Sequence, residues 1–573
     1  MVSRLADTDD YVSIVLAGEA GQGIQTVEHI LARVLKLSGY NVFSSKEYMS
    51  RIRGGTNSTE IRISSRRVSS FVDRIDILTP LSEGALQHLG ERVSSETMIL
   101  GDRENLQREY RGREDKIMDV PFSQVASDVG SKIYSNTVAV GVLSGLFKVE
   151  INILEDYLRE HFSAKGEKVV RKNIKAARKG YEIGADLVAS GKIEVKIEKN
   201  FKVTDEVLVN GAEAVALGAI GGGCNFVSFY PMSPSTPVAV FMAQHSRDFD
   251  IVVEQAEDEI SAMNMAVGAW YAGARAMVTT SGGGFALMVE GLSLAGMLEM
   301  PVVIHLGQRP APATGLPTRT EQGDLLFTLH AGHGEFPRII LAPGSIEDAF
   351  YLTQKAFNLA DKYQVPVFLL TDQYLLDSYY NIPSLTTSSL HIERCIVRTD
   401  KDYKRYKITP DGISPRGIPG FGEGLVVVDS DEHNAEGHIT EDFEVRTKMV
   451  DKRLKKLGSM KKEAIPPELV GSKNYKTLIV GWGSTYHVVK EAIGHLGRED
   501  ISFLHFKQVY PLPLATSDYL KKARRRVVIE NNATSQFGSL IELCTGINIE
   551  KKILKYNGLP FFLEEVMENM RTL

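Results

Sequence analysis

The chain has 573 residues, 43% of them hydrophobic and 24% charged, and a formal net charge of −6 at pH 7. This length predicts three or four domains, and the acidic balance argues against a general nucleic-acid binder. The N-terminus "MVSRLADTDDY" has no apolar signal core, and no apolar stretch is long enough to span a bilayer, so we expect a cytoplasmic protein.

The first region, residues 1–198, predicts an α/β domain. A strand, "YVSIVLAG", leads through the turn "GEAGQG" into a helix from about 24 to 37, and short apolar strands alternate with helices after it. The turn has the spacing GxxGxG and not GxGxxG, which argues against a dinucleotide site. Arg51–Ser58, "RIRGGTNS", has two arginines beside a glycine pair and is a candidate anion patch of low specificity.

The second region, residues 206–380, is the least polar. Its strands are expected in the runs "NFVSFY", "FDIVVE", "RAMVTT", "PVVIHL", "RIILAP" and "PVFLLT", with helical stretches between them. Because each run is short, apolar and rich in β-branched or aromatic residues, the pattern predicts a parallel sheet buried on both faces.

The remaining chain divides into two further regions. Residues 381–474 are charged and broken by glycine and proline, which predicts an extended excursion ending in one amphipathic helix near Glu444–Leu457. Residues 475–573 return to an α/β pattern with "TLIVGWGS", "ISFLHF" and "RRVVIE". The fold class predicted for the whole chain is multidomain α/β.

The chain is poor in groups that bind metals. Its three cysteines, Cys224, Cys395 and Cys544, are far apart and form no CxxC, so they cannot supply the four thiolates of a cubane iron–sulfur cluster. His433 and His438 lie among acids in "SDEHNAEGHITED", match no metal-site spacing, and are expected in a solvated loop. We assign no metal ligand to this chain.

Polar residues follow four strands of the second region. In an open parallel sheet, ligands bind outside the carboxyl ends of the strands, so these residues are expected to converge. The segments are "PMSPSTP", "AEDEISAMNMAVGAWYAGA", "SGGGF" and "GQRPAPATGLPTRTEQGD". Together they resemble half of an active site.

The segment "YPMSPSTP", residues 230–237, has two compatible interpretations. Ser233 can cap a helix whose first turn contains Pro234 and Pro237, because proline is tolerated there. The same helix start can attract an anion through its free N–H groups. Local sequence alone does not decide between a structural cap and a ligand-facing hydroxyl.

The other segments also allow a structural and a functional interpretation. Four acids, Glu254, Glu257, Asp258 and Glu259, gather at a helix start, where the helix dipole favours carboxylates, so only one of them need be catalytic. The glycines of "SGGG", Ser281–Gly284, fit a tight turn or the close approach of a ligand. Arg309 can fork onto a carboxylate, and Thr318 and Arg319 are further candidate anion ligands, although Arg319 can equally be a surface arginine.

Several long motifs carry a family resemblance. "YPMSPSTP", "QAEDEISAMNMAVGAWYAGARAM", "TTSGGGFALM", "LGQRPAPATGLPTRTEQGDL", "TDQYLLDS", "YKITPDGISPRGIPGFGEG" and "DEHNAEGHITED" resemble the α subunit of 2-oxoacid:ferredoxin oxidoreductases, most closely the 2-oxoglutarate type. "GEAGQGI" and "EYMSRIRGG" are similar to that family's γ domain, fused here ahead of α. The resemblance covers nearly the whole chain.

The resemblance implies a thiamine diphosphate enzyme that decarboxylates a 2-oxoacid, passes electrons to ferredoxin and forms an acyl-CoA. Residues 1–198 then form a γ-type domain, 206–380 the pyrimidine-binding domain and 475–573 a transketolase C-terminal-like domain. No GDG followed at a suitable distance by Asn holds diphosphate and Mg²⁺ in this chain, so Mg²⁺ and a cubane (4Fe–4S) cluster are expected on a separate β subunit. The expected assembly is a dimer of αβ heterodimers.

Site residues follow from the resemblance position by position. Glu259 fits the glutamate that bonds the aminopyrimidine ring, where a carboxyl group favours the imino tautomer, and Glu257 is its rival by proximity. Ser233 fits the hydroxyl near the substrate carboxylate, where the family often has the threonine of YPIT, and Arg309 fits the arginine that binds that carboxylate. Thr318 and Arg319 are expected at the far end of the substrate; the expected cofactor contacts are Tyr230, Pro231, Ser281, Gly282 and Gly283.

Three alternatives remain at this stage. Pyruvate, a branched-chain 2-oxoacid or indolepyruvate can replace 2-oxoglutarate as the substrate. A non-catalytic assembly scaffold is a second alternative, against which the intact Glu259, Ser233 and Arg309 argue. A nucleotide-binding dehydrogenase built on the first domain is the third, and its glycine spacing counts against it.

Overall fold

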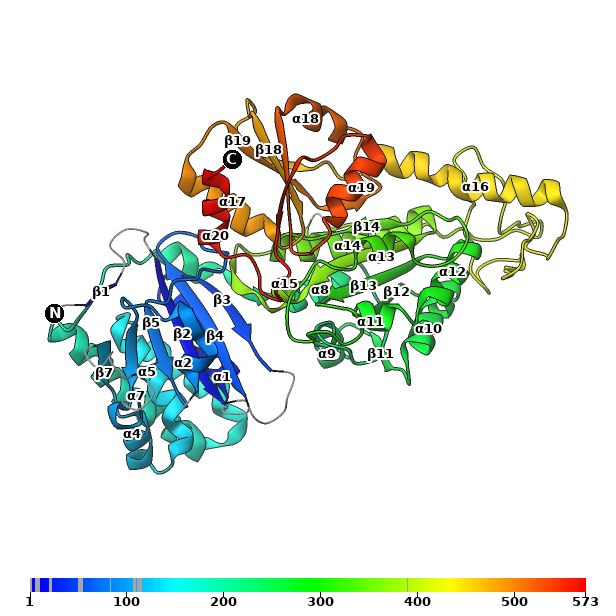
Figure 1. Cartoon of the computed structure of the whole chain (residues 1–573). Helices are drawn as coiled ribbons and strands as arrows, with labels where there is room; N and C mark the ends of the chain where they lie inside the picture. The colour runs from blue at the N-terminus through cyan, green and yellow to red at the C-terminus, as the bar shows by residue number, and fades with distance from the viewer. Residues whose placement is uncertain are drawn as a thin grey trace. The chain divides into compact units, whose positions relative to one another are not determined.

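A computed structural model describes residues 3–5, 11–19, 23–49, 55–82, 84–106, 110, 116–388 and 390–573 (Figure 1). Residues 20–22 of the turn "GEAGQG" and residues 51–54 of the predicted anion patch lie outside these residues. The chain divides into two compact units: residues 1–209, 377–384 and 562–564 form unit 1, and residues 210–376, 385–561 and 565–573 form unit 2. The four-part division proposed from the sequence stays a prediction.

Unit 1 is built on a mixed sheet of eight strands among the described residues, in the order β7-β6-β5-β2-β4-β3-β16-β9. Strands β2, β5, β6 and β7 are parallel, whereas β4 runs antiparallel to β2 and β3. The strands are β2 (Tyr11–Glu19), β3 (Asn41–Glu47), β4 (Thr56–Ser64), β5 (Ile77–Pro80), β6 (Met98–Gly101), β7 (Ile117–Asp119), β9 (Val207–Asn210) and β16 (Tyr379–Ile382); β1 (Ser3–Leu5) pairs separately with β8 (Ile193–Val195).

The longer helices of unit 1 pack closely through small residues. A Cβ added at Gly141 of α5 would lie 2.2 Å from the Ala177 carbonyl oxygen, and one at Gly180 of α7 would lie 2.2 Å from the Val138 carbonyl oxygen. Glycine therefore sets the distance between these two helices. The helices are α1 (Ile24–Leu37), α2 (Ala85–Leu89), α3 (Arg103–Leu106), α4 (Phe122–Val129), α5 (Ser135–Leu146), α6 (Ile151–Phe162) and α7 (Glu167–Ala189).

Unit 2 contains the sheet predicted for the second region. Its order is β11-β10-β12-β13-β15-β14-β20; the first six strands are parallel, and β20 adds antiparallel to β14. The predicted parallel sheet is confirmed, although β11 lies at its edge with Val252 exposed. The strands are β10 (Phe226–Phe229), β11 (Val252–Gln255), β12 (Ala276–Thr280), β13 (Val302–Gln308), β14 (Ile339–Leu341), β15 (Pro366–Asp372) and β20 (Gln508–Tyr510).

Helices connect the parallel strands of this sheet, as the alternation of apolar runs and helical stretches predicts. They are α8 (Gly211–Gly221), α9 (Thr236–Gln244), α10 (Glu259–Tyr271), α11 (Gly282–Phe285), α12 (Val289–Met297), α13 (Leu325–His330), α14 (Ile346–Tyr363) and α15 (Gln373–Asp377).

The C-terminal part of unit 2 forms a second sheet, in the order β17-β19-β18-β21-β22. All neighbours in it are parallel except β17, which runs antiparallel to β19. Its elements are β17 (Glu468–Gly471), β18 (Thr477–Trp482), α17 (Thr485–Leu496), β19 (Ile501–Phe506), α18 (Thr516–Lys522), β21 (Arg525–Glu530), α19 (Gln536–Thr545), β22 (Lys551–Leu554) and α20 (Leu563–Arg571). No helix in the described ranges is long and apolar enough to cross a membrane.

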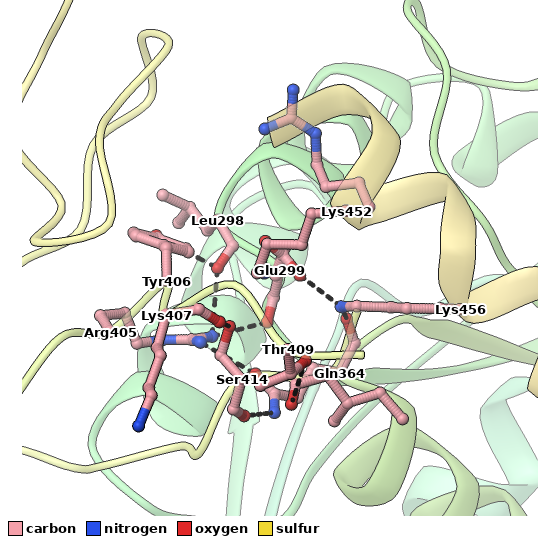
Figure 2. Close-up of polar contacts among 12 residues, drawn as sticks. Leu298, Glu299, Gln364, Arg405, Tyr406, Lys407, Thr409, Ser414, Lys452 and Lys456 are labelled. Carbon is pink, nitrogen blue, oxygen red and sulfur yellow. Dashed lines mark hydrogen bonds and ion pairs between the residues drawn. The ribbon is translucent and has the colours of Figure 1, made fainter. Parts of the chain in front are cut away.

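The excursion between the sheets ends in helix α16 (Phe443–Lys462), yellow in Figure 1. This helix buries basic side chains that pair with Glu299 of the sheet domain. Lys452 Nζ lies 2.6 Å from Glu299 Oε1, and Lys456 Nζ lies 2.5 Å from Glu299 Oε2. Arg405 donates to the Glu299 carbonyl oxygen at 2.8 Å. Figure 2 shows the three cations around Glu299, with the two lysines directed at its carboxylate and Arg405 at the backbone carbonyl oxygens of Leu298 and Glu299. Burial raises the pKa of Glu299, but the two ammonium groups and Arg405 outweigh it and lower the pKa well below its usual range.

The histidine loop of the excursion differs from the prediction. His433 is fully buried, its ring centroid lies 3.8 Å from that of Tyr406, and its Nδ1 lies 3.0 Å from the Asp431 carbonyl oxygen. The expectation of a solvated loop is therefore wrong for His433, because its ring packs against Tyr406 inside the excursion and the neighbouring Glu432 pairs with the buried Arg453. His438 is exposed, as expected.

Candidate active site

Four neighbouring strands of the unit 2 sheet end at one edge, since β11, β10, β12 and β13 are parallel and in register. The segment around Ser233 follows β10, Glu259 begins the helix after β11, Ser281 follows β12 and Arg309 follows β13. Contacts between these segments, described below, show that the chain brings their side chains together.

The turn after β10 corrects one prediction. Ser233 does not cap the helix: α9 begins at Thr236, and Ser235 occupies the N-cap position. The Ser235 hydroxyl instead donates to the Met232 carbonyl oxygen at 2.8 Å, which closes one further turn of backbone before the helix starts. Ser233 is thereby left exposed at the sheet edge, while its carbonyl oxygen accepts a hydrogen bond from Arg309 Nη1 at 2.6 Å.

Burial separates the four acids near the start of α10. Glu254 and Glu257 are exposed, and Asp258 caps the helix by accepting a hydrogen bond from the Ser261 N–H at 2.8 Å. Glu259 is only 3% exposed, and its Oε1 has no hydrogen-bond partner in the described part of the chain. Because a buried unpaired carboxylate oxygen is costly, Glu259 is the acid of the four that needs a ligand.

The triple-glycine segment forms one helical turn, α11, against which two carboxylates pack. A Cβ at Gly284 would lie 2.5 Å from Glu259 Oε1, and a Cβ at Gly282 would lie 2.5 Å from Asp324 Oδ2. A Cβ at Gly283 would meet nothing closer than 3.7 Å. The outer glycines are therefore needed for space, and the middle one faces the open side of the turn.

Arg309 is 8% exposed, and its Nε has no hydrogen-bond partner among the described residues. Burial lowers the pKa of this guanidinium, and the charge of Asp324 opposes the shift. A buried cation that keeps one N–H free at a sheet edge is suited to a carboxylate ligand.

Asp324 is a site residue that the sequence interpretation missed. It is 6% exposed, its Oδ2 is unpaired, and burial together with Glu321 raises its pKa to about 6 against the opposing effect of Arg309. In the sequence it is the last residue of "TEQGD", and nothing there distinguishes it from a helix-start acid. Its burial against Gly282 became visible only in the fold.

Thr318 and Arg319 lie in the long loop after Arg309, and both are partly buried. The Arg319 N–H donates to the Leu316 carbonyl oxygen at 3.1 Å, and its stem packs on Gly558, where an added Cβ would lie 3.2 Å from the Arg319 Cβ. The loop thus contacts the C-terminal part of unit 2. The role expected for these two residues stays a prediction.

Comparisons with known proteins agree with this arrangement. Residues 217–452 match the family model "Pyruvate flavodoxin/ferredoxin oxidoreductase, thiamine diP-bdg", and residues 13–183 match "Pyruvate ferredoxin/flavodoxin oxidoreductase". The α subunit of a 2-oxoacid:ferredoxin oxidoreductase from Sulfolobus sp is 34% identical, with 97% of this chain and 96% of the relative covered. The 2-oxoglutarate synthase subunit KorA of Archaeoglobus fulgidus is 33% identical; the match covers 98% of that subunit and 63% of this chain.

Among solved structures, the 2-oxoglutarate:ferredoxin oxidoreductase from Magnetococcus marinus, with 2-oxoglutarate, coenzyme A and succinyl-CoA bound, superimposes with a TM-score of 0.92. It is 31% identical, and the match covers 99% of this chain and 100% of that one. The fold and the site thus define a thiamine-diphosphate-binding oxidoreductase. The chain belongs to the family of 2-oxoacid:ferredoxin oxidoreductase α subunits, with a γ-like domain fused ahead of the α portion.

The residues at the sheet edge fit the pyrimidine half of thiamine diphosphate. Glu259 presents an unpaired, buried carboxylate oxygen, and Ser281 presents a fully buried hydroxyl without a partner in the described structure. Between them the glycine turn leaves its middle position open. A polar ring with nitrogen donors and acceptors would satisfy these atoms.

Proposed function

We propose that this chain is the γα-fused α subunit of an enzyme that oxidatively decarboxylates 2-oxoglutarate to succinyl-CoA and reduces ferredoxin. The same site serves the reverse, CO₂-fixing direction. The observation that carries the proposal is the unpaired buried oxygen of Glu259 at the sheet edge where Arg309 keeps a free N–H.

Bound thiamine diphosphate supplies the carbanion-stabilising chemistry of the reaction. Glu259 holds a proton at the pyrimidine ring nitrogen, since its Oε1 is buried, unpaired and fixed against Gly284. Low exposure keeps water from competing for that oxygen, which strengthens the hydrogen bond. Tyr230, Pro231, Ser281, Gly282 and Gly283 line the same edge as cofactor contacts.

Arg309 and Ser233 are proposed to bind the carboxylate common to all 2-oxoacids. The Arg309 guanidinium is fixed by its hydrogen bond to the Ser233 carbonyl oxygen at 2.6 Å, so the cation and the exposed Ser233 hydroxyl belong to one rigid unit. Preorganisation of this kind lowers the entropic cost of orienting the substrate. Thr318 and Arg319 are proposed to recognise the far end, where 2-oxoglutarate carries its second carboxylate.

A β subunit is proposed to cover the edge and to supply Mg²⁺, the diphosphate site and a cubane iron–sulfur cluster. Large apolar side chains are exposed after the ends of β10, β11 and β12 and at the start of the outer strand β11, which is typical of a surface that another protein covers. They are Tyr230 at 40%, Phe249 at 51%, Val252 at 55%, Ile260 at 47% and Leu287 at 52% exposure. Ferredoxin is the proposed electron acceptor, and a dimer of αβ heterodimers the proposed assembly.

The experiment is turnover of the co-expressed αβ complex, measured anaerobically with CoA and ferredoxin or viologen. The substrates are 2-oxoglutarate, pyruvate and 2-oxoisovalerate. Glu259→Gln is expected to reduce kcat by about a hundredfold or more. Its matched control is Glu257→Gln, which changes an exposed acid two residues away and is expected to leave kcat within about twofold.

The outcomes separate the parts of the proposal. Preference for 2-oxoglutarate together with collapse in Glu259→Gln supports the substrate and the role of the glutamate. Preference for another oxoacid keeps the mechanism and removes the role proposed for Arg319. Inactivity with every oxoacid, in a complex that holds its clusters and thiamine diphosphate, favours an assembly scaffold.

A further inference from the structure

Four buried polar atoms without partners in the described structure surround the glycine turn. They are Glu259 Oε1, Ser281 Oγ, Arg309 Nε and Asp324 Oδ2. The proposed function gives a ligand to the first three. Asp324 remains, and a buried carboxylate without a hydrogen bond requires an explanation.

Asp324 is held in place by its backbone and not by its carboxylate. Its N–H donates to Gln308 Oε1 at 3.0 Å, and Gln308 in turn donates to the Thr371 carbonyl oxygen at 3.1 Å. Although Asp324 precedes α13, its side chain makes no capping hydrogen bond. A Cβ at Gly282 would lie within 2.6 Å of both carboxylate oxygens, so the chain omits a side chain there to make room for this group.

Asp324 and Arg309 act on each other through their charges. Each opposes the burial-driven shift in the pKa of the other, yet Arg309 Nε and Asp324 Oδ2 both remain unpaired. The two groups are therefore coupled without a hydrogen bond between them. A carboxylate ligand on Arg309 would neutralise the cation and add a negative charge beside Asp324, and both effects favour the protonated acid.

We propose that Asp324 is a positioning residue for Arg309 that takes up one proton from solvent when the carboxylate of a 2-oxoacid binds that arginine. The proposal rests on the proposed function, because it requires a 2-oxoacid at Arg309. The charged groups that act on Asp324 are Arg309 from the end of β13 and Glu321 from its own loop, and Glu259 packs on the other end of the glycine turn.

The proposal fixes the sign of a pH effect on substrate affinity. Asp324, with a pKa of about 6 in the free site, is about one-tenth protonated at pH 7. Binding that raises this pKa absorbs up to about 0.9 proton at pH 7. The Kd for the 2-oxoacid therefore rises with pH above about 6, by up to about tenfold per pH unit.

The test is isothermal titration of 2-oxoglutarate, and separately of pyruvate, into the αβ complex stripped of thiamine diphosphate, so that no turnover occurs. Repeating it at pH 7 in buffers of different ionisation enthalpy counts the protons. The wild-type complex is expected to absorb at least about half a proton per oxoacid bound. Asp324→Asn is expected to absorb none and to show a Kd independent of pH between 6 and 8.

Glu321→Gln provides a second variant that leaves Asp324 in place. Proton uptake should persist in this variant because Asp324 is still present. Removing the Glu321 charge lowers the pKa of Asp324, so the rise in Kd should begin at a lower pH than in wild type. A merely structural role for Asp324 would not produce this displacement. The melting temperature of each complex reports whether the variant folds.

Each result has one meaning. Binding of either oxoacid without proton uptake, or an unmoved pH profile in Glu321→Gln, overturns the role of Asp324 and leaves the proposed function standing. Failure of the wild-type complex to bind or turn over any 2-oxoacid overturns the proposed function and this inference with it. Uptake in wild type that disappears in Asp324→Asn establishes the inference.

Discussion

The glycine turn predicts a sharp contrast between two neighbouring substitutions. In Gly284→Ala the new Cβ would lie 2.3 Å from Thr280 Oγ1 and 2.5 Å from Glu259 Oε1, where ordinary contact begins at 3.4 Å. The Glu259 carboxylate must therefore move by about 0.9 Å. Displacement of a catalytic group by about 1 Å costs about a hundredfold in rate, and overpacking of this kind costs about 1–3 kcal/mol of stability.

Gly283→Ala is the matched control for stability, since Gly283 is itself a proposed cofactor contact. The nearest atom to a Cβ at Gly283 lies 3.7 Å away, and α11 is helical there, so alanine fits and its better helix propensity contributes up to about 1 kcal/mol. The assay is 2-oxoacid-dependent reduction of viologen by the αβ complex, with melting temperatures for both variants. We expect kcat to fall about a hundredfold in Gly284→Ala, with a lower melting temperature, and we expect Gly283→Ala to melt at or above the wild-type temperature. A folded Gly284→Ala complex with near wild-type kcat would refute the reasoning.

Three further predictions follow. Arg309→Lys should lower kcat/KM for every 2-oxoacid at least about tenfold, because an ammonium cannot replace a guanidinium fixed on the Ser233 carbonyl oxygen; steady-state kinetics check this. Ser233→Thr keeps the hydroxyl and restores the residue frequent in the family, so kcat/KM should stay within about threefold in the same assay. Burial lowers the pKa of Lys456 from its ordinary value of 10.5 to about 8 in the folded protein. Between pH 8 and 10.5 the unfolded chain therefore binds more protons than the folded one, and the free energy of unfolding should rise with pH. Denaturant titrations should show this rise in wild type and its absence in Lys456→Met.

The parallel sheet of unit 2 could be predicted from the sequence because its strands are short apolar runs separated by helical stretches. The convergence of polar segments at its edge followed from the same pattern. The exposure of Val252 could not be predicted, since strand order decides which apolar run lies at the edge.

The candidate site was predictable in part. The four acids before α10 were equivalent in local sequence, and only burial distinguishes Glu259 from Glu257. The capping role considered for Ser233 is excluded, because the helix starts two residues later, after a turn that the Ser235 hydroxyl closes on the Met232 carbonyl oxygen. Asp324 was missed because its environment comes from Gly282, a residue distant in the sequence.

Helix α16 shows that the buried face of a helix cannot always be predicted from the positions of its charged residues. Its buried residues include Lys452 and Lys456, which a sequence pattern assigns to the solvent side. Their partner, Glu299, lies 153 residues before Lys452, and pairing over that separation leaves no local signal. Tertiary electrostatics therefore overrode the hydrophobic pattern.

The buried ion cluster of Figure 2 also bears on how this protein can be divided. The three cations around Glu299, namely Arg405, Lys452 and Lys456, all come from the excursion, while the acid belongs to the catalytic sheet. A fragment ending near residue 380 would lose all three cations and the hydrogen bonds that Arg405 and Tyr406 donate to the carbonyl oxygens of Leu298 and Glu299. The excursion and the sheet therefore form one structural unit. Truncated variants, domain exchanges and transfers into another scaffold must keep both together.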